Sequence, residues 1–146
     1  MTSFKAYLGV ARGPFLLLPV TLVAAGAAAA AADGAFDLLR TFVALAGLVV
    51  LHAAVNALNE WSDFRGGIDR ETERTPFSGG SATLPKGLMG SRTALATGIV
   101  CAALGLVAGL WFLVELGPVM VPILVLGAFA VVTYTDLLAR LGVGEL

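Results

Sequence analysis

Five polar side chains occur at helical spacing at the end of an apolar stretch, and their types suit metal binding. They are His52, Asn56, Asn59, Glu60 and Asp63. On a helix, His52, Asn56, Asn59 and Asp63 fall within a sector of roughly 60°, and Glu60 lies at its edge. Carboxylate and amide oxygens are hard ligands of the kind that Mg²⁺ prefers. We therefore favour a functional role for Asn59 and Asp63. For His52 we favour the alternative, hydrogen bonding between helices, which also applies to Asn56.

The same polar residues open a segment at residues 59–92 that reads NEWSDFRGGIDRETERTPFSGGSATLPKGLMGSR. Connections of this length often form lids or binding loops. The segment holds the acids Glu60, Asp63, Asp69, Glu71 and Glu73 and the bases Arg65, Arg70, Arg74, Lys86 and Arg92, a balance that argues against a basic lipid-surface anchor. Mg²⁺ commonly binds through one or two carboxylates and substrate phosphates, and arginines can bind the remaining phosphate oxygens. The piece Ser78–Ser81 either presents backbone N–H groups to an anion or is a simple turn. Together these residues predict a metal-diphosphate site that opens into lipid.

The rest of the chain must place this segment at a membrane. Hydrophobic residues make up 58% and charged residues 13% of the chain, against about a quarter charged in soluble proteins. Mean hydropathy is +0.92, and a backbone in lipid satisfies its hydrogen bonds by forming helices. We predict an all-α, polytopic transmembrane bundle, a single membrane domain over residues 1–146. Its four expected spans, each of about 20 residues, cover 14–32, 38–58, 93–114 and 116–135. The first span has an alternative reading as a cleaved signal peptide.

Lysine and arginine positions predict the orientation of the four spans, because these residues favour cytoplasmic loops. Eight of the nine fall on one side, and only Arg40 falls on the other. The N-terminus and the loop 59–92 are therefore expected to be cytoplasmic, in a multi-pass protein of the cell (inner) membrane.

Other function classes are disfavoured by composition. A net charge of −1 implies no nucleic-acid partner. The single cysteine, Cys101, excludes an internal disulfide and reads as a small buried thiol in an apolar run. No Cys/His cluster has the spacing of a zinc site.

At the polar segment the chain resembles the UbiA superfamily of membrane prenyltransferases. Its Asn-Asp-x-x-Asp-x-x-x-Asp motif is similar to NEWSDFRGGID, in which Asn59 and Asp63 match, Glu60 replaces an aspartate, and Asp69 lies two residues late. That spacing and the following TPFSGGSATLPKG resemble the menaquinone-type branch, which prenylates 1,4-dihydroxy-2-naphthoate. The opening ARGPFLLLPVTLVAAG and the closing YTDLLARLGVGEL resemble further segments of the family.

The resemblance implies a reaction and a set of site residues. A polyprenyl diphosphate loses its diphosphate with the help of Mg²⁺, and an aromatic acceptor attacks the allylic carbon. The implied metal ligands are Asn59, Glu60, Asp63 and Asp69, with Asp63 and Asp69 as the catalytic pair. The implied diphosphate contacts are Asn59, Arg65, Arg70, Arg74, Lys86 and Arg12, although Arg12 is alternatively a snorkelling topology anchor. Trp61, Phe64, Phe77 and Tyr134 are candidates to stabilise the allylic cation, with packing or an interfacial position as the favoured alternative for each.

The chain also departs from the family. Members have about nine transmembrane helices and a second Asp-rich motif, whereas these residues provide four spans and one motif. We expect the N-terminal part of a longer enzyme, or an enzyme that a second polypeptide completes, and no turnover by these residues alone. The alternatives are a non-catalytic four-helix membrane protein or transporter subunit, and a CDP-alcohol phosphotransferase, whose Asp-Gly-x-x-Ala-Arg signature is absent. The acceptor, the prenyl chain length and the oligomeric state are left open by the sequence.

Overall fold

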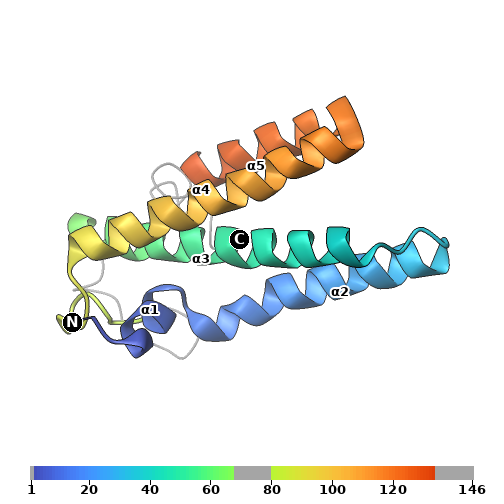
Figure 1. Cartoon of the computed structure of the whole chain (residues 1–146). Helices are drawn as coiled ribbons and strands as arrows, with labels where there is room; N and C mark the ends of the chain where they lie inside the picture. The colour runs from blue at the N-terminus through green and yellow to red at the C-terminus, as the bar shows by residue number, and fades with distance from the viewer. Residues whose placement is uncertain (1, 68–79, 134–146) are drawn as a thin grey trace.

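The computed structural model describes residues 2–67 and 80–133, and every regular element in these two ranges is helical. The elements are α1 (Phe4–Val10), the 3₁₀ turn η1 (Gly13–Leu16), α2 (Leu17–Ala32), α3 (Leu38–Gly66), α4 (Ser91–Leu116), the 3₁₀ turn η3 (Gly117–Met120) and α5 (Val121–Thr133). Figure 1 shows α2, α3 and α4 running side by side, with α5 next to α4.

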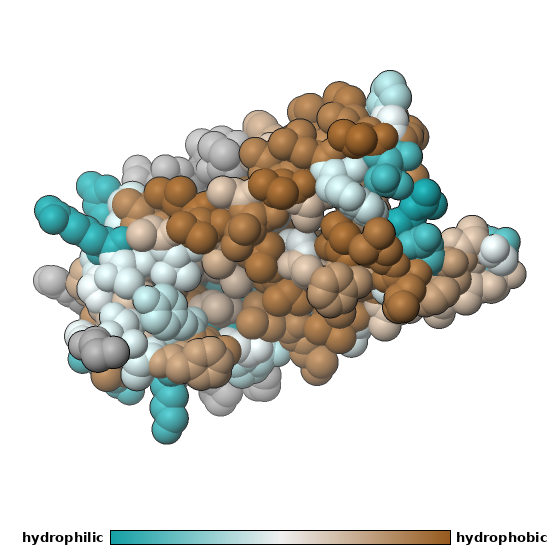
Figure 2. All heavy atoms as spheres, in the orientation of Figure 1, coloured by the Kyte–Doolittle hydropathy of each residue, from teal (hydrophilic) through white to brown (hydrophobic). Residues whose placement is uncertain are grey.

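Three helical stretches are long and apolar enough to cross a membrane. They are Gly13–Ala32, Leu38–Gly66 and Ser91–Val131, and the third contains the reversal between α4 and α5. Their apolar side chains are mostly exposed, as lipid-facing side chains are. Figure 2 shows hydrophobic residues over the middle of the visible face and hydrophilic residues towards both ends of the helices. The expected all-α transmembrane architecture is therefore confirmed.

The fourth expected span, 116–135, differs from the helix observed. Leu116 still belongs to α4, and Gly117 adopts the left-handed φ of 75° that ends it. The 3₁₀ turn that follows contains Pro118 and delays the start of α5 to Val121. Helix α5 then folds back on α4, because Leu124 lies against Gly109. Residues 134 and 135 lie outside the described ranges.

The expected loop 59–92 is shorter than the sequence suggested, because both flanking helices extend into it. No proline or glycine interrupts residues 59–65, so α3 continues to Gly66 and ends where Gly67 takes a φ of 78°. Helix α4 begins at Ser91. At 1.5 Å per residue α3 is about 43 Å long, against about 30 Å for the hydrocarbon core of a bilayer. One end of α3 must therefore project beyond the hydrocarbon.

Close packing of α3 against α4 depends on small residues. A Cβ atom added at Gly47 would lie 2.7 Å from Ala108 Cβ, and one added at Gly98 would lie 2.7 Å from Leu58 Cγ. Small residues let two helix backbones approach closely in a membrane, where apolar surface alone does not drive association. The pairing of these residues shows that the two helices are antiparallel.

The end of the bundle that carries the polar residues, here called the site end, combines four parts of the chain. These are α1, the C-terminal end of α3, residues 80–90 and the start of α4, and Figure 1 shows them gathered beside the N-terminus. A small core holds them together, the site-end cluster, which consists of Ala6, Val10, Ala57, Leu84, Met89 and Ala94. The opposite end, the far end, contains the α2–α3 connection, where the Asp37 side chain accepts the Arg40 N–H and caps α3.

Candidate functional site

Asn59 and Asp63 occupy successive turns of α3 at the site end. The amide oxygen of Asn59 is buried and has no hydrogen-bond partner within the described residues. Asp63 is half-buried, and the charges of Arg12 and Glu60 both act on its carboxylate. An unpaired buried oxygen is unusual in a folded protein, because burial without a partner costs free energy. The pair therefore offers two oxygen ligands, one of which no other described residue uses.

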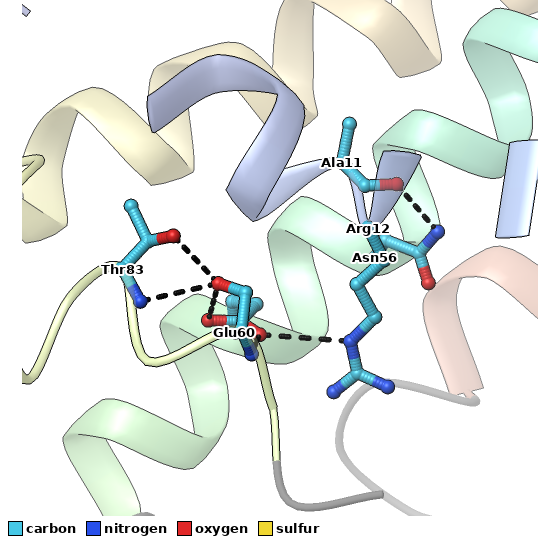
Figure 3. Close-up of polar contacts among 6 residues, drawn as sticks. Ala11, Arg12, Asn56, Glu60 and Thr83 are labelled. Atoms are coloured by element: carbon cyan, nitrogen blue, oxygen red, sulfur yellow. Dashed lines mark hydrogen bonds and ion pairs between the residues drawn. The ribbon is translucent and has the colours of Figure 1, made fainter. Parts of the chain in front are cut away.

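Glu60 lies on the neighbouring face of α3, and its environment is different. The residue is only 1% exposed. Its carboxylate accepts the backbone N–H of Ser81, and its other oxygen accepts the Ser81 hydroxyl at 3.0 Å. The Arg12 Nε lies 3.5 Å from the first oxygen, as Figure 3 shows. A buried carboxylate is tolerated when it is paired and hydrogen-bonded in this way.

The segment that follows residue 80 wraps over Glu60 through two hydroxyl groups. The Ser81 and Thr83 hydroxyls are hydrogen-bonded at 2.7 Å, and the Thr83 N–H donates to Ser81 Oγ at 3.2 Å. Ser81 has one hydroxyl proton, which it gives to Glu60, so Thr83 supplies the proton between the two hydroxyls. A Cβ atom at Gly9 would overlap Thr83 Oγ1. Helix α1 can therefore lie this close to the segment only because residue 9 is glycine.

Arg12 lies in the turn between α1 and η1, and its side chain reaches Glu60. Arg12 has a left-handed backbone, with φ of 50° and ψ of 61°. Its N–H donates to the Gly9 carbonyl, and its carbonyl accepts the Phe15 N–H, each at 2.8 Å. The Asn56 side-chain amide donates to the Ala11 carbonyl at 2.9 Å. Asn56 thus has a structural role at this turn. This agrees with hydrogen bonding, the alternative that the sequence analysis gave for Asn56.

The remaining sequence candidates are dispersed or lie outside the described residues. Arg65 is exposed, and its guanidinium carbon lies 4.9 Å from the centre of the Trp61 ring. Lys86 is exposed in the segment after residue 80. Trp61 and Phe64 pack against the site-end cluster, which confirms the packing alternative for these two. The candidates outside the described residues are Asp69, Arg70, Arg74, Phe77 and Tyr134.

The described residues fit a magnesium site that is completed by substrate phosphates. Residues 2–67 and 80–133 contain no group of three or more His, Cys, Asp or Glu side chains placed to hold a metal on their own. Asn59 Oδ1 and the Asp63 carboxylate are hard oxygen donors, and Mg²⁺ needs few protein ligands when it binds with a phosphate. Glu60 fits less well as a ligand, because Ser81 and Arg12 already occupy its carboxylate.

Sequence reasoning missed Thr83 and Gly9 and gave Ser81 only a general role. Ser81 does turn its backbone N–H towards an anion, as the glycine-rich piece suggested, but that anion is Glu60. Thr83 and Gly9 carry no local signal, because their contact joins parts of the chain more than 70 residues apart. Only the fold brings these residues to the site.

The chain matches one protein family over most of its length. The model of the UbiA prenyltransferase family matches residues 17–146, which include α2 to α5 and every polar side chain of α3 described above. No curated protein and no solved structure matches the chain. The family match extends over most of the sequence, and the chain therefore belongs to the UbiA prenyltransferase family.

Proposed function

We propose that this protein takes part in Mg²⁺-dependent transfer of a polyprenyl group from a prenyl diphosphate to an aromatic acceptor. Membership of the family supports prenyl transfer in general. The acceptor that the motif spacing favours is 1,4-dihydroxy-2-naphthoate, which would place the reaction in menaquinone biosynthesis. The observation that carries the proposal is the buried amide oxygen of Asn59, which has no partner within residues 2–67 and 80–133 and lies one helical turn from Asp63.

The proposed roles follow from the chemistry of the side chains. Asn59 and Asp63, with Asp69 from outside the described residues, would hold Mg²⁺. When bound, Mg²⁺ neutralises the charge that develops on the leaving diphosphate. Within the described residues, Arg12 is a cation whose charge acts on Asp63, and guanidinium groups bind phosphate oxygens in pairs. Arg65, Arg70, Arg74 and Lys86 are further proposed diphosphate contacts.

The location of the site suits a substrate with a charged head and an apolar tail. The head would lie at the site end, and the tail would enter the apolar part of the bundle. The allylic C–O bond breaks, the electron pair leaves with the diphosphate, and a ring carbon of the acceptor bonds to the allylic carbon. The acceptor ring then loses a proton. Side chains that exclude water protect the cation-like carbon during this exchange.

A binding measurement tests the proposal without requiring turnover. The purified chain in detergent is titrated with farnesyl diphosphate by calorimetry, in Mg²⁺ and in EDTA. We expect binding in Mg²⁺ only, and Asp63→Asn should weaken it at least about tenfold, because the loss of one carboxylate removes a metal ligand. Farnesol, which lacks the diphosphate, is the ligand control.

The matched protein control is Asp33→Asn, because Asp33 is an exposed aspartate at the far end. This variant should bind farnesyl diphosphate as the original chain does. Equal binding in Mg²⁺ and EDTA, or an undiminished affinity in Asp63→Asn, would contradict the proposal and favour the non-catalytic membrane protein.

A further inference from the structure

We propose that Glu60 is a positioning residue of the diphosphate site. Its carboxylate forms an ion pair with the Arg12 Nε and accepts hydrogen bonds from Ser81, whose hydroxyl is bonded to that of Thr83. The inference rests on the proposed function, because it assigns the part of that site that presents a cation to the diphosphate. It also gives Glu60 a different role from the metal ligand that the motif implied.

The carboxylate of Glu60 is already engaged by the protein. The side chain is fully buried, and both of its oxygens accept hydrogen bonds from Ser81. The Arg12 Nε supplies the compensating charge at 3.5 Å. A metal ion at Glu60 would compete with the two Ser81 donors and would repel the Arg12 guanidinium, whose buried Nε has no hydrogen-bond partner within the described residues and depends on this ion pair. Glu60 is therefore suited to organise protein groups rather than to bind a metal.

The ion pair uses only one edge of the Arg12 guanidinium. An arginine has five N–H donors, and four of them are on the two terminal nitrogens. In Figure 3 the dashed line to Glu60 starts at Nε and not at either terminal nitrogen. The Arg12 side chain is 23% exposed, and its charge also acts on Asp63. Within the described residues the ion pair engages only Nε, so the terminal nitrogens are available near the candidate metal ligands, in a geometry suited to bidentate phosphate binding.

Helix α3 also fixes the backbone of the turn between α1 and η1. Asn56 and Glu60 are four residues apart, so they project from one side of the helix. Asn56 holds the Ala11 carbonyl, and Glu60 holds the next side chain, Arg12. A left-handed arginine backbone is unfavourable by itself and persists where its surroundings fix it. Helix α3 therefore determines both the position and the direction of Arg12.

A double-mutant cycle tests this role in the full chain. Farnesyl diphosphate affinity at saturating Mg²⁺ is measured for the original chain, Glu60→Gln, Arg12→Gln and the double variant. We expect each single variant to weaken binding about tenfold. The double variant should bind no more weakly than Arg12→Gln, because Glu60 acts through Arg12.

A second readout separates positioning from metal binding. The Mg²⁺ concentration that gives half-maximal binding is measured at saturating farnesyl diphosphate. We expect Glu60→Gln to leave this concentration unchanged, whereas Asp63→Asn should raise it. Additive losses in the cycle, or a raised Mg²⁺ requirement in Glu60→Gln, would overturn the inference and leave the proposed function in place. Absence of any Mg²⁺-dependent binding by the original chain would overturn both.

Ser81→Ala provides a milder variant in case Glu60→Gln does not fold. It removes one donor to Glu60 and leaves the Arg12 contact in place, so we expect a loss of about two- to fivefold that disappears in the Arg12→Gln background. The matched control is Thr97→Ala, since the Thr97 hydroxyl donates only to Thr93 in its own helix, at 2.8 Å. An equal effect of Ser81→Ala in both backgrounds contradicts the inference.

Discussion

At the scale of single residues, the neighbouring residues Asn59 and Glu60 of α3 differ in how their buried oxygens are hydrogen-bonded. Both carboxylate oxygens of Glu60 accept hydrogen bonds from Ser81, whereas Asn59 keeps an amide oxygen unpaired within the described residues. A neutral amide can remain unpaired at a cost of about 1–3 kcal/mol. A buried carboxylate at the same position would cost more and would be repelled by Glu60 and Asp63. This difference explains how Asn59 can stay available for a ligand in the unliganded fold.

The first residue-scale prediction concerns Asn59→Leu. Leucine has a similar volume and no oxygen, so the variant should be about 1–3 kcal/mol more stable than the original chain without ligand. It should also lose the stabilisation that Mg²⁺ and farnesyl diphosphate give the original chain. Thermal unfolding in detergent, followed by tryptophan fluorescence with and without both ligands, measures the two effects.

Asn56→Leu is the matched exchange for this measurement. Asn56 lies one turn away on the same helix, but its amide donates to the Ala11 carbonyl. Its loss leaves that carbonyl without a donor, so Asn56→Leu should lower the unfolding midpoint. Unfolding midpoints that move in the same direction for both variants would contradict the assignment of the Asn59 amide oxygen as a metal ligand.

At the scale of elements, the site depends on how closely α4 approaches α3. Gly47 and Gly98 lie at the contact, and their missing side chains allow Ala108 and Leu58 to pack against the opposite backbone. The end of α3 is then covered by α1 and by residues 80–90, which share the site-end cluster with the start of α4. A change in the spacing of α3 and α4 would therefore reach Glu60 and Asn59.

The element-scale prediction compares two Gly→Ala substitutions. At Gly47 the new methyl group would meet Ala108 Cβ, which is fixed to its backbone, so the helices must separate at a cost of about 1–3 kcal/mol. At Gly26 nothing lies within 4 Å, because this residue is exposed beside an open groove between α2, α3 and α4. Both variants gain the same helix preference of roughly 0.5–1 kcal/mol, so their difference reports the contact.

Thermal unfolding in detergent distinguishes these two variants. We expect Gly47→Ala to unfold at a lower temperature than Gly26→Ala, and Gly26→Ala to match or exceed the original chain. Equal midpoints would show that α3 and α4 do not depend on this close approach.

The same scale shows which features the sequence predicts and which it does not. The apolar runs predict the long helices α2, α3 and α4, because such helices depend mainly on composition, but they do not predict that α3 continues to Gly66. Helix α1 was not expected, because it is only seven residues long and buries just Ala6 and Val10. The helical spacing of the polar residues on α3 also follows from the sequence. The partners of Glu60 do not, because Ser81 and Arg12 reach it only through the folded bundle.

At the scale of the whole molecule, charge is distributed unevenly between the two ends of the bundle. Lys5, Arg12, Arg65, Lys86 and Arg92 belong to elements of the site end, whereas Arg40 lies at the far end. There its Nη2 lies 3.6 Å from a Glu115 oxygen, and both side chains are more than a third exposed. Such an exposed pair adds little stability, but it partly offsets the charge of Arg40. Positive charge is thus concentrated where the diphosphate site is proposed.

This asymmetry predicts that the site end faces the cytoplasm, because lysine and arginine near membrane helices favour that side. Cys101 is the only cysteine, so Cys101→Ala provides a background for single-cysteine labelling. In that background we introduce Lys86→Cys at the site end and Ala35→Cys at the far end, both at exposed positions. A membrane-impermeant maleimide added to intact cells should label Ala35→Cys and spare Lys86→Cys, and inverted membrane vesicles should give the opposite pattern. Labelling of Lys86→Cys from outside intact cells would show the opposite orientation, in which the proposed site does not face a diphosphate substrate supplied by the cytoplasm.

A second site-end variant controls for charge, because Lys86→Cys removes one of the charges that orient the chain. Leu88→Cys lies two residues further on, is also at an exposed position and changes no charge. It must give the same labelling pattern as Lys86→Cys.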